Sequence, residues 1–378
     1  MRGLHDTISR LGALRQRPLG MAPNDGRLEP FHGFGSNPGR LDAWTYVPEG
    51  LPKGAPLVVV LHGCTQNARG YDHGSGWSAA AEEHGFAVLF PEQQRANNPN
   101  LCFNWYRPQD ARRGAGEALS IRQMVTAMQV RHGTDPARVF VTGLSAGGAM
   151  AAVMLATYPD VFAGGAVIAG LPFGTAHSVP EAFDRMRGHG VMSGEALAAL
   201  VTAASTHGGP WPTLSVWHGT GDMIVDSSNA TALVDQWRAL HGVADARPDT
   251  GRVAGYPHRV WRDSDGRPVI EEYAITGAGH GTPLSALDGD GGETPGPYML
   301  ETGISSTQHS LRFWGIAAVS RKAARAATSK PAREQDHPPV NEAAHAPARR
   351  HATRRLPSGG GIQKTIEDAL RAAGLLQR

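Results

Sequence analysis

The chain has 378 residues, of which 40% are hydrophobic, enough for one large globular domain with additional segments. Its 36 basic and 34 acidic residues nearly cancel, so the overall charge gives no reason to expect nucleic acid or an anionic membrane as partner. Two cysteines, Cys64 and Cys102, exclude a disulfide framework and a four-ligand zinc site but suffice for one bridge.

Residues 1–40 are predicted to be a peripheral basic segment. Leu4, Ile8, Leu11 and Leu14 recur every three or four residues, which predicts a short helix before a Gly/Pro/Asn-rich stretch. Charged residues interrupt this start, so the apolar stretch of roughly 7–15 residues that marks a secretion signal is not evident. No run approaches the roughly 20 apolar residues of a membrane span, and we expect no membrane association.

Residues 41–317 alternate apolar, strand-like runs with helical patterns. This alternation predicts an α/β fold, with a mostly parallel central sheet flanked by helices. The strand-like runs are Ala43–Val47, Leu57–Leu61, Phe86–Phe90, Val139–Thr142, Gly164–Ala169, Leu214–His218 and Val269–Ile275. Helices are expected over Trp77–Glu83, Glu117–His132, the residues after Ser145, and Ala230–Leu240.

Two further segments depart from this alternation. Residues 176–207 carry two helical patterns between consecutive strands and are too long for a loop of about 2–6 residues, so we interpret them as a small lid-like insertion. Residues 318–358 are rich in Ala, Pro, Arg and His without an apolar period, which predicts a flexible basic linker. Residues 359–378 follow as a short amphipathic helix.

The segment Val139–Gly148 has the order strand, Gly-x-Ser-x-Gly, helix, with Ser145 at its centre. A serine hydroxyl acts as a nucleophile when a base removes its proton and when it protrudes from a sharp turn. Gly143 and Gly147 leave room for backbone that a Cβ would obstruct. Because Gly is common in this chain, the triplet alone is weak, and the flanking strand and helix give it weight. The pattern is typical of the nucleophile in an α/β-hydrolase.

A second apolar strand ends in His62-Gly63, followed by Cys64 and Thr65. In an α/β-hydrolase the loop after this strand donates one backbone N–H to the oxyanion, and the residue after the nucleophile donates the other. The expected donors are the amides of Cys64, with Thr65 as the alternative, and of Ala146. A tight turn with a core histidine is the plain structural alternative.

The acid and the base are expected in loops at the carboxyl ends of later strands. Asp222 follows the strand-like run Leu214–His218, and Asp226 is its competitor. His280 lies between glycines after the last such run, and it is the expected base. The rival histidines are His309, His258 and His62. The chain order Ser145, Asp222, His280 matches that of α/β-hydrolases.

Several short motifs together resemble the polyhydroxybutyrate depolymerase family of esterases, which also includes feruloyl and acetylxylan esterases. They are LHGCTQN (61–67), CFNWY (102–106), GLSAGGAMA (143–151), HGTGD (218–222) and GAGHG (277–281). The resemblance extends from about Leu41 to Gly315, where SSTQHSLRFWG also fits. Such a series is far more specific than Gly-x-Ser-x-Gly alone.

The resemblance implies Ser145 as nucleophile, Asp222 as acid and His280 as base, with an oxyanion donor at Cys64. It also implies a substrate-facing aromatic ring at Trp105. The family places both cysteine segments beside the active site, so we expect Cys64 and Cys102 to lie close enough for a disulfide, with two separate buried thiols as the alternative. Family members are often extracellular, whereas no signal peptide is evident here, so a cytoplasmic location is a second expectation.

The expected function is hydrolysis of carboxylic esters, either short-chain esters or 3-hydroxyalkanoate oligomers, through an acyl-enzyme. No phosphate-binding loop or His/Cys ligand cluster is found, so we expect neither metal nor cofactor. A peptidase or thioesterase using the same triad is one alternative. A non-catalytic binding protein acting through its basic tail is the other.

Overall fold

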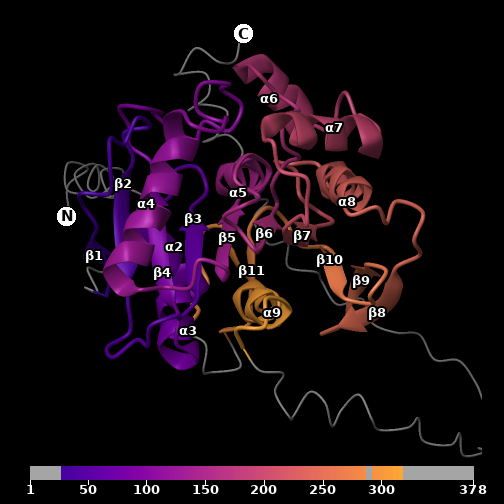
Figure 1. Ribbon diagram of the computed structural model, residues 1–378. Coiled ribbons are helices and arrows are strands. Elements are labelled where there is room, and N and C mark those ends of the chain that lie inside the picture. The colour runs from indigo at the N-terminus through magenta and orange to yellow at the C-terminus, as the bar shows by residue number, and fades with distance from the viewer. Residues whose placement is uncertain (1–26, 287–291, 318–378) are drawn as a thin grey trace, which may run out of the picture. The chain divides into compact units, whose positions relative to one another are not determined.

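A mixed β-sheet forms the centre of the protein in the computed structural model, which describes residues 27–286 and 292–317 (Figure 1). The sheet order is β1-β2-β4-β3-β5-β6-β7-β10-β9-β8. The strands are β1 Glu29–Pro30, β2 Asp42–Tyr46, β3 Leu57–Leu61, β4 Ala87–Glu92, β5 Val139–Leu144, β6 Gly164–Ile168, β7 Thr213–Gly219, β8 Asp249–Val253, β9 Tyr256–Arg262 and β10 Pro268–Ile275. The expected N-terminal helix, the linker 318–358 and the C-terminal helix 359–378 lie outside the described residues.

The middle of the sheet, from β4 through β3, β5, β6 and β7 to β10, is parallel. Antiparallel strands extend it on both sides: β2 and β1 beyond β4, and β9 and β8 beyond β10. This confirms the expected mostly parallel sheet. Parallel strands end at the same edge, so the loops after β3, β5, β7 and β10 come together there.

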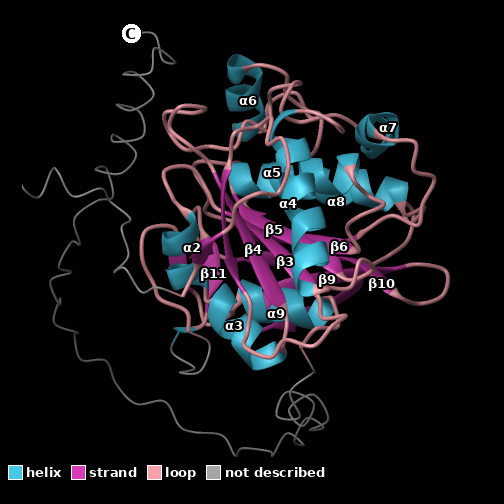
Figure 2. Ribbon diagram, turned by 60° about the vertical axis from the view of Figure 1, so that its left-hand side comes forward, coloured by secondary structure: helices cyan, strands magenta, loops and turns pink. Residues whose placement is uncertain are grey.

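Helices cover both faces of the sheet (Figure 2). Helices α4, α5 and α8 lie on one face, and α2, α3 and α9 on the other. These helices are α2 Ala68–Ser75, α3 Trp77–His84, α4 Gly116–His132, α5 Ala146–Thr157, α8 Ser228–Leu240 and α9 Ser306–Phe313. The expected helices correspond to α3, α4, α5 and α8.

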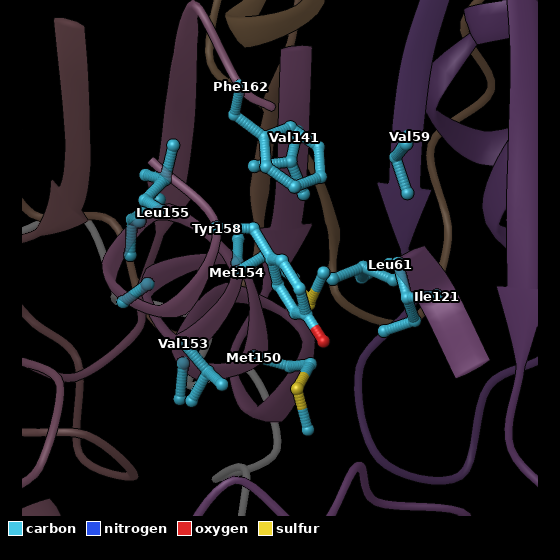
Figure 3. Close-up of a cluster of buried hydrophobic side chains, with 14 of the residues drawn as sticks. Val59, Leu61, Ile121, Val141, Met150, Val153, Met154, Leu155, Tyr158 and Phe162 are labelled. Carbon is cyan, nitrogen blue, oxygen red and sulfur yellow. The ribbon is translucent and has the colours of Figure 1, made fainter. Parts of the chain in front are cut away.

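The alternation of side chains along β3 explains this arrangement. Its five residues are all buried: Leu57, Val59 and Leu61 point to one core, whereas Val58 and Val60 point to the other. A strand covered on both faces therefore appears in the sequence as an uninterrupted apolar run. Figure 3 shows the first of these cores, where Val59, Leu61 and Val141 of the sheet meet Ile121 of α4 and Met150 and Met154 of α5.

Helix α5 is buried along its whole length and packs against β3, β5, β6 and α4. Its Ala- and Gly-rich first half allows close approach to the sheet. This matters for function because α5 begins directly after Ser145, so the packing of the helix fixes the position of that residue.

The segment interpreted as an insertion contains the two expected helices, α6 Val179–Met186 and α7 Gly194–Ala204. Helix α7 packs against α8 and α5. The Gln236 side chain of α8 exchanges hydrogen bonds with the backbone of Phe173 and also donates to Leu197 O. Asp226 N donates to Met186 O at 2.7 Å, which ties the insertion to the loop between β7 and α8.

Strands β8 and β9 form a hairpin that was not expected from the sequence. Four of the five β8 residues are exposed, so its pattern lacks the apolar alternation of a half-buried strand. A tight turn joins β9 to β10, in which Asp263 N donates to Arg267 O and Ser264, Asp265 and Gly266 are exposed.

The last described residues complete the second core. Strands β11 Thr282–Leu284 and β12 Met299–Glu301 form a separate pair. After α9, Trp314 stacks on Phe140 at 4.9 Å between ring centroids and on Trp77 at 6.1 Å. Ala317 is only 6% exposed. Within the described residues, no helix combines the length and apolar character needed to cross a membrane.

Candidate active site

Ser145 lies in the turn between β5 and α5, with φ 57° and ψ −118°. A positive φ is unfavourable for a residue with a Cβ and persists only where the surroundings enforce it. Ser145 N donates to Ile168 O at 2.9 Å, and Ser145 O accepts from Ala149 N at 2.8 Å. These contacts hold the residue in a strained turn that is typical of nucleophiles.

The two glycines of the motif are required by close backbone contacts. A Cβ on Gly143 would lie 2.4 Å from the Gly147 carbonyl group, and a Cβ on Gly147 would lie 2.3 Å from Leu61 O and 2.5 Å from His62 O. The end of β3 is thus pressed against the first turn of α5. Ala146, the first residue of α5, has an amide without an acceptor four residues earlier in the helix.

His280 and Asp222 are hydrogen-bonded in loops that follow β10 and β7. His280 Nδ1 and Asp222 Oδ2 are 2.7 Å apart, and their side chains are 7% and 0% exposed. Asp222 Oδ1 accepts from the amides of Ile224 and Val225 at 2.8 and 2.9 Å. Burial by itself would raise the pKa of Asp222, but hydrogen bonds from His218 and His280 hold that pKa below its usual range.

Backbone contacts tie these two loops together. Gly221 N donates to Ala278 O at 2.9 Å, and Thr220 N donates to Ile275 O at 3.0 Å. A Cβ on Gly219 would lie 2.3 Å from Ala278 O, so the close approach depends on that glycine. The loops therefore present the acid and the imidazole as one unit.

His218 is a second histidine against Asp222, and it was not predicted as a site residue. Its Nε2 atom lies 3.4 Å from Asp222 Oδ2 and 2.9 Å from Val225 O. The side chain is 4% exposed. His218 stands four residues before Asp222 in the HGTGD motif, but this spacing alone does not show that the two side chains are in contact. That contact becomes visible only in the packing at the end of β7.

The rival residues have other partners. His62 Nδ1 lies 2.8 Å from Gly63 O, and burial lowers the pKa of His62 to about 4. His258 lies 3.2 Å from Glu271, and His309 lies 3.3 Å from Tyr273 Oη. Asp226 is exposed, and its Oδ1 accepts from Ser228 N at 2.9 Å, at the start of α8. None of these contacts involves Asp222 or His280.

The loop after β3 is held by several contacts. A disulfide joins Cys64 to Cys102, with Cα atoms 4.2 Å apart. Thr65 N donates to Asn100 O at 2.7 Å, so this amide is already engaged. The loop after β3 is therefore linked, covalently and through the backbone, to the loop that leads to Trp105.

A buried carboxylate at the start of α4 organises the same region. Glu117 accepts from Gln93 Nε2 at 2.6 Å, Asn104 N at 2.8 Å and Asn104 Nδ2 at 2.5 Å. Gln93 N in turn donates to His62 Nε2 at 3.1 Å. Burial raises the pKa of Glu117 to about 7 despite these hydrogen bonds. Glu117 lies in a helix, as expected, but this role was not predicted from the sequence.

Trp105 is 8% exposed and packs edge-to-face against Tyr106, with ring centroids 5.6 Å apart. It follows Asn104, which is fixed by Glu117. The His280 ring packs edge-to-face against Tyr298, with ring centroids 6.0 Å apart. In the described part of the chain, no three His, Cys, Asp or Glu side chains are grouped as metal ligands.

Comparisons with known proteins show which proteins the chain resembles. A family model described as esterase PHB depolymerase matches residues 42–259. The chain is 47% identical over 294 residues to poly(3-hydroxyalkanoate) depolymerase C of Paucimonas lemoignei, across 76% of this chain and 70% of that protein. It is 31% identical over 269 residues to the probable acetylxylan esterase A of Aspergillus flavus, across 69% of this chain and 86% of that protein.

The fold has a solved counterpart. The structure of an acetyl xylan esterase from Aspergillus awamori superposes with a TM-score of 0.65 at 26% identity, covering 77% of this chain and 100% of the other. All three named proteins are ester hydrolases by name.

Proposed function

Since the chain belongs to the esterase PHB depolymerase family and is a carboxylic ester hydrolase, we propose that Ser145, His280 and Asp222 carry out the hydrolysis through an acyl-enzyme. The observation that carries this proposal is the buried His280–Asp222 contact of 2.7 Å, in loops at the same edge of the parallel sheet as the strained turn at Ser145. A non-catalytic binding role is therefore set aside.

The proposed first half-reaction is acylation of Ser145. With Nδ1 held by Asp222, His280 Nε2 is the nitrogen left to take the Ser145 proton while Oγ bonds to the ester carbonyl carbon. The tetrahedral intermediate collapses, the carbon–oxygen bond to the alcohol breaks, and His280 returns the proton to the departing alcohol. Water then attacks the acyl-enzyme in the same way, which releases the acid and restores Ser145.

We propose the amides of Ala146 and Cys64 as the oxyanion donors. Ala146 N is at the helix start, where it lacks a helical acceptor. The engagement of Thr65 N by Asn100 O favours Cys64 over Thr65. Preorganised amides of this kind typically contribute about 10²–10³ in kcat each.

We further propose that Trp105 forms part of the acyl-binding wall and that 3-hydroxyalkanoate oligomers or short-chain esters are the substrates. The name of the relative from Paucimonas lemoignei supports the hydroxyalkanoate class. Trp105 is supported by its loop, which the disulfide joins to the proposed oxyanion loop. Initial rates over a panel of p-nitrophenyl esters, hydroxybutyrate oligomers, acetylated xylan, feruloyl esters and peptide anilides test this assignment.

The nucleophile is tested with Ser145→Ala. Loss of a nucleophile in such a unit typically costs about 10⁶ in kcat, so p-nitrophenyl butyrate hydrolysis should fall to background and labelling by a fluorophosphonate should disappear. Ser264→Ala, in the exposed β9–β10 turn, is the matched control and should retain both properties. Wild-type turnover by folded Ser145→Ala would refute the proposal.

The choice of acid is tested with two asparagine variants. Asp222→Asn should lower kcat by about 10⁴ because the imidazole tautomer is no longer held. Asp226→Asn should have little effect, since Asp226 bonds the start of α8 rather than His280. The reverse pattern would move the acid to Asp226.

A further inference from the structure

A second imidazole approaches the carboxylate of Asp222. Asp222 has no exposed side-chain surface, and four groups surround its two oxygens. Oδ1 accepts from two loop amides, whereas Oδ2 faces His280 Nδ1 at 2.7 Å and His218 Nε2 at 3.4 Å. The proposed mechanism uses His280 and leaves His218 without a role.

The contacts of His218 fix its tautomer. Its Nε2 lies 2.9 Å from Val225 O, and because a carbonyl oxygen only accepts, Nε2 must carry the hydrogen. Its Nδ1 is buried and has no hydrogen-bond partner among the described residues, so a second N–H there would be left unsatisfied. The Nε2–H group thus lies between Val225 O and Asp222 Oδ2.

The position of His218 is set by the sheet rather than by a loop. It is the second-last residue of β7 and pairs with Ala274 of β10, so its backbone is fixed in the parallel ladder. Asp222, in contrast, lies in a turn in which Asp222 N donates to Gly219 O. A rigid donor beside a loop carboxylate is suited to orient that carboxylate.

The charged and titratable groups around Asp222 are few. His280 approaches from the loop after β10, His218 from β7, and Asp226 lies four residues further along the same loop. Asp226 is exposed and is partnered by Ser228. Among these groups, only His218 and His280 contact Asp222 directly.

We propose that His218 is a positioning residue for the proposed triad. Its Nε2–H orients the Asp222 carboxylate and, because it shares Oδ2 with His280, weakens the attraction between that carboxylate and His280. This inference rests on the proposed function of Asp222. A carboxylate without the second donor would interact more strongly with protonated His280, so the base would lose its proton only at higher pH. The carboxylate would also be held less firmly, by the two loop amides and His280 alone.

The test compares His218→Phe with His218→Gln in the full-length protein. His218→Phe keeps an aromatic ring but removes the donor, and it should lower kcat for p-nitrophenyl butyrate by about tenfold, the effect of one lost hydrogen bond. KM should stay unchanged, and the acidic limb of the kcat/KM profile should move up by about half a pH unit. Gln can place an amide N–H near the position of Nε2, so His218→Gln should restore most of both properties.

His241→Phe is the matched control. His241 is also largely buried, and its Nε2 also lies close to a backbone carbonyl, Pro212 O at 3.0 Å, but it does not contact Asp222. His241→Phe should lose about as much thermal stability as His218→Phe but should leave the acidic limb unshifted. This result would show that the shift arises from the contact with Asp222 and not from loss of the contact with a backbone carbonyl.

A double-mutant cycle completes the test. If His218 acts through Asp222, adding His218→Phe to Asp222→Asn should cause little further loss of kcat, because the carboxylate that it orients is already gone. Fully additive losses together with an unshifted acidic limb would overturn the proposal. Turnover that survives Ser145→Ala in the same series would overturn the triad itself, and with it this inference.

Discussion

Ser145 combines an unfavourable backbone conformation with close backbone packing on both sides. Its φ of 57° is maintained because Gly143 and Gly147 allow the end of β3 and the first turn of α5 to touch. Residues with strained backbone typically cost about 1–3 kcal/mol each and persist where neighbouring structure enforces them. The rigid sheet and the buried α5 provide that enforcement here.

Glu117 is a carboxyl group buried at the start of α4. Three N–H groups donate to its carboxylate, and no basic side chain forms an ion pair with it there. Its pKa of about 7 means that deprotonation costs more free energy in the folded protein than in the unfolded chain. The fold tolerates this cost at a position that orders Asn104, next to Trp105.

We predict that Glu117→Gln weakens the pH dependence of stability. The folded-state pKa is raised from 4.5 to about 7, so the folded protein binds more protons than the unfolded chain between these values. The contribution of Glu117 to the free energy of unfolding is fully present below about pH 4.5. It falls by about 3 kcal/mol in total as the pH rises through 7. Urea unfolding at pH 5 and pH 8 measures this difference, which should shrink in Glu117→Gln.

The control for this prediction is Glu49→Gln, because Glu49 is exposed. In this variant the difference between the free energies of unfolding at pH 5 and pH 8 should equal that of the wild type. An unchanged difference in Glu117→Gln would show that Glu117 does not titrate in this range.

At the scale of single residues, the sequence was sufficient to select Ser145, Asp222 and His280 as candidates but not to find their supporting residues. The candidates follow strand-like runs, where local patterns are informative. His218 and Glu117 lie in a strand and a helix, and their roles depend on which side chains of distant segments face them. Periodicity does not reveal such contacts.

Among the secondary-structure elements, the loop after β3 and the segment from Asn98 to Trp105 behave as one unit. The Cys64–Cys102 disulfide, the Thr65 N–Asn100 O hydrogen bond and the network around Glu117 all connect them. The proposed oxyanion donor at Cys64 is therefore supported by a neighbouring loop rather than by β3 alone.

We predict that removing the disulfide lowers both stability and kcat. The bridge closes a loop with a sequence separation of 38, and its loss should reduce the free energy of unfolding by about 3–4 kcal/mol. A loosened oxyanion loop should lower kcat more than it raises KM. The variant carrying both Cys64→Ser and Cys102→Ser is measured by urea unfolding and by ester hydrolysis.

Treatment of the wild type with a reductant should reproduce these effects, and the double serine variant is the control that should not respond to it. Equal stability of the wild type and the variant under oxidising conditions would contradict the prediction.

The predictability of an element depended on its burial. The parallel strands were found because they are covered on both faces and form apolar runs, as in β3. Strands β8 and β9 were missed because the exposed, polar β8 has no apolar period. Helix α2 was missed for a related reason: its sequence ARGYDHGS is polar and contains two glycines, although Asn67 caps it by accepting from Gly70 N.

At the scale of the whole molecule, the packing of the last described residues shows that they belong to the folded unit. Trp314 stacks on Phe140 and Trp77, and Ala317 is buried, so residues up to Ala317 belong to the second core. Helix α9 is therefore part of the folded unit and cannot be treated as part of the basic tail.

We predict that a stop after Ala317 leaves soluble-ester hydrolysis and the melting temperature unchanged, whereas a stop after Gly303 prevents folding. The second change removes α9 and Trp314, and loss of a buried Trp alone typically costs about 3–5 kcal/mol. Circular dichroism melts and p-nitrophenyl butyrate rates measure both variants. A large loss of soluble-ester activity after the first change would show that residues 318–378 take part in catalysis or folding.

The direction of the strands has a practical consequence for protein engineering. The proposed site lies at the carboxyl edge of the parallel strands, whereas the β9–β10 turn precedes β10 and so lies at its opposite end. The exposed residues Ser264, Asp265 and Gly266 of that turn make it a suitable place to splice in a foreign module, such as a carrier-binding peptide for immobilisation. An enzyme tethered there would present its catalytic edge to the solution and its tether to the support.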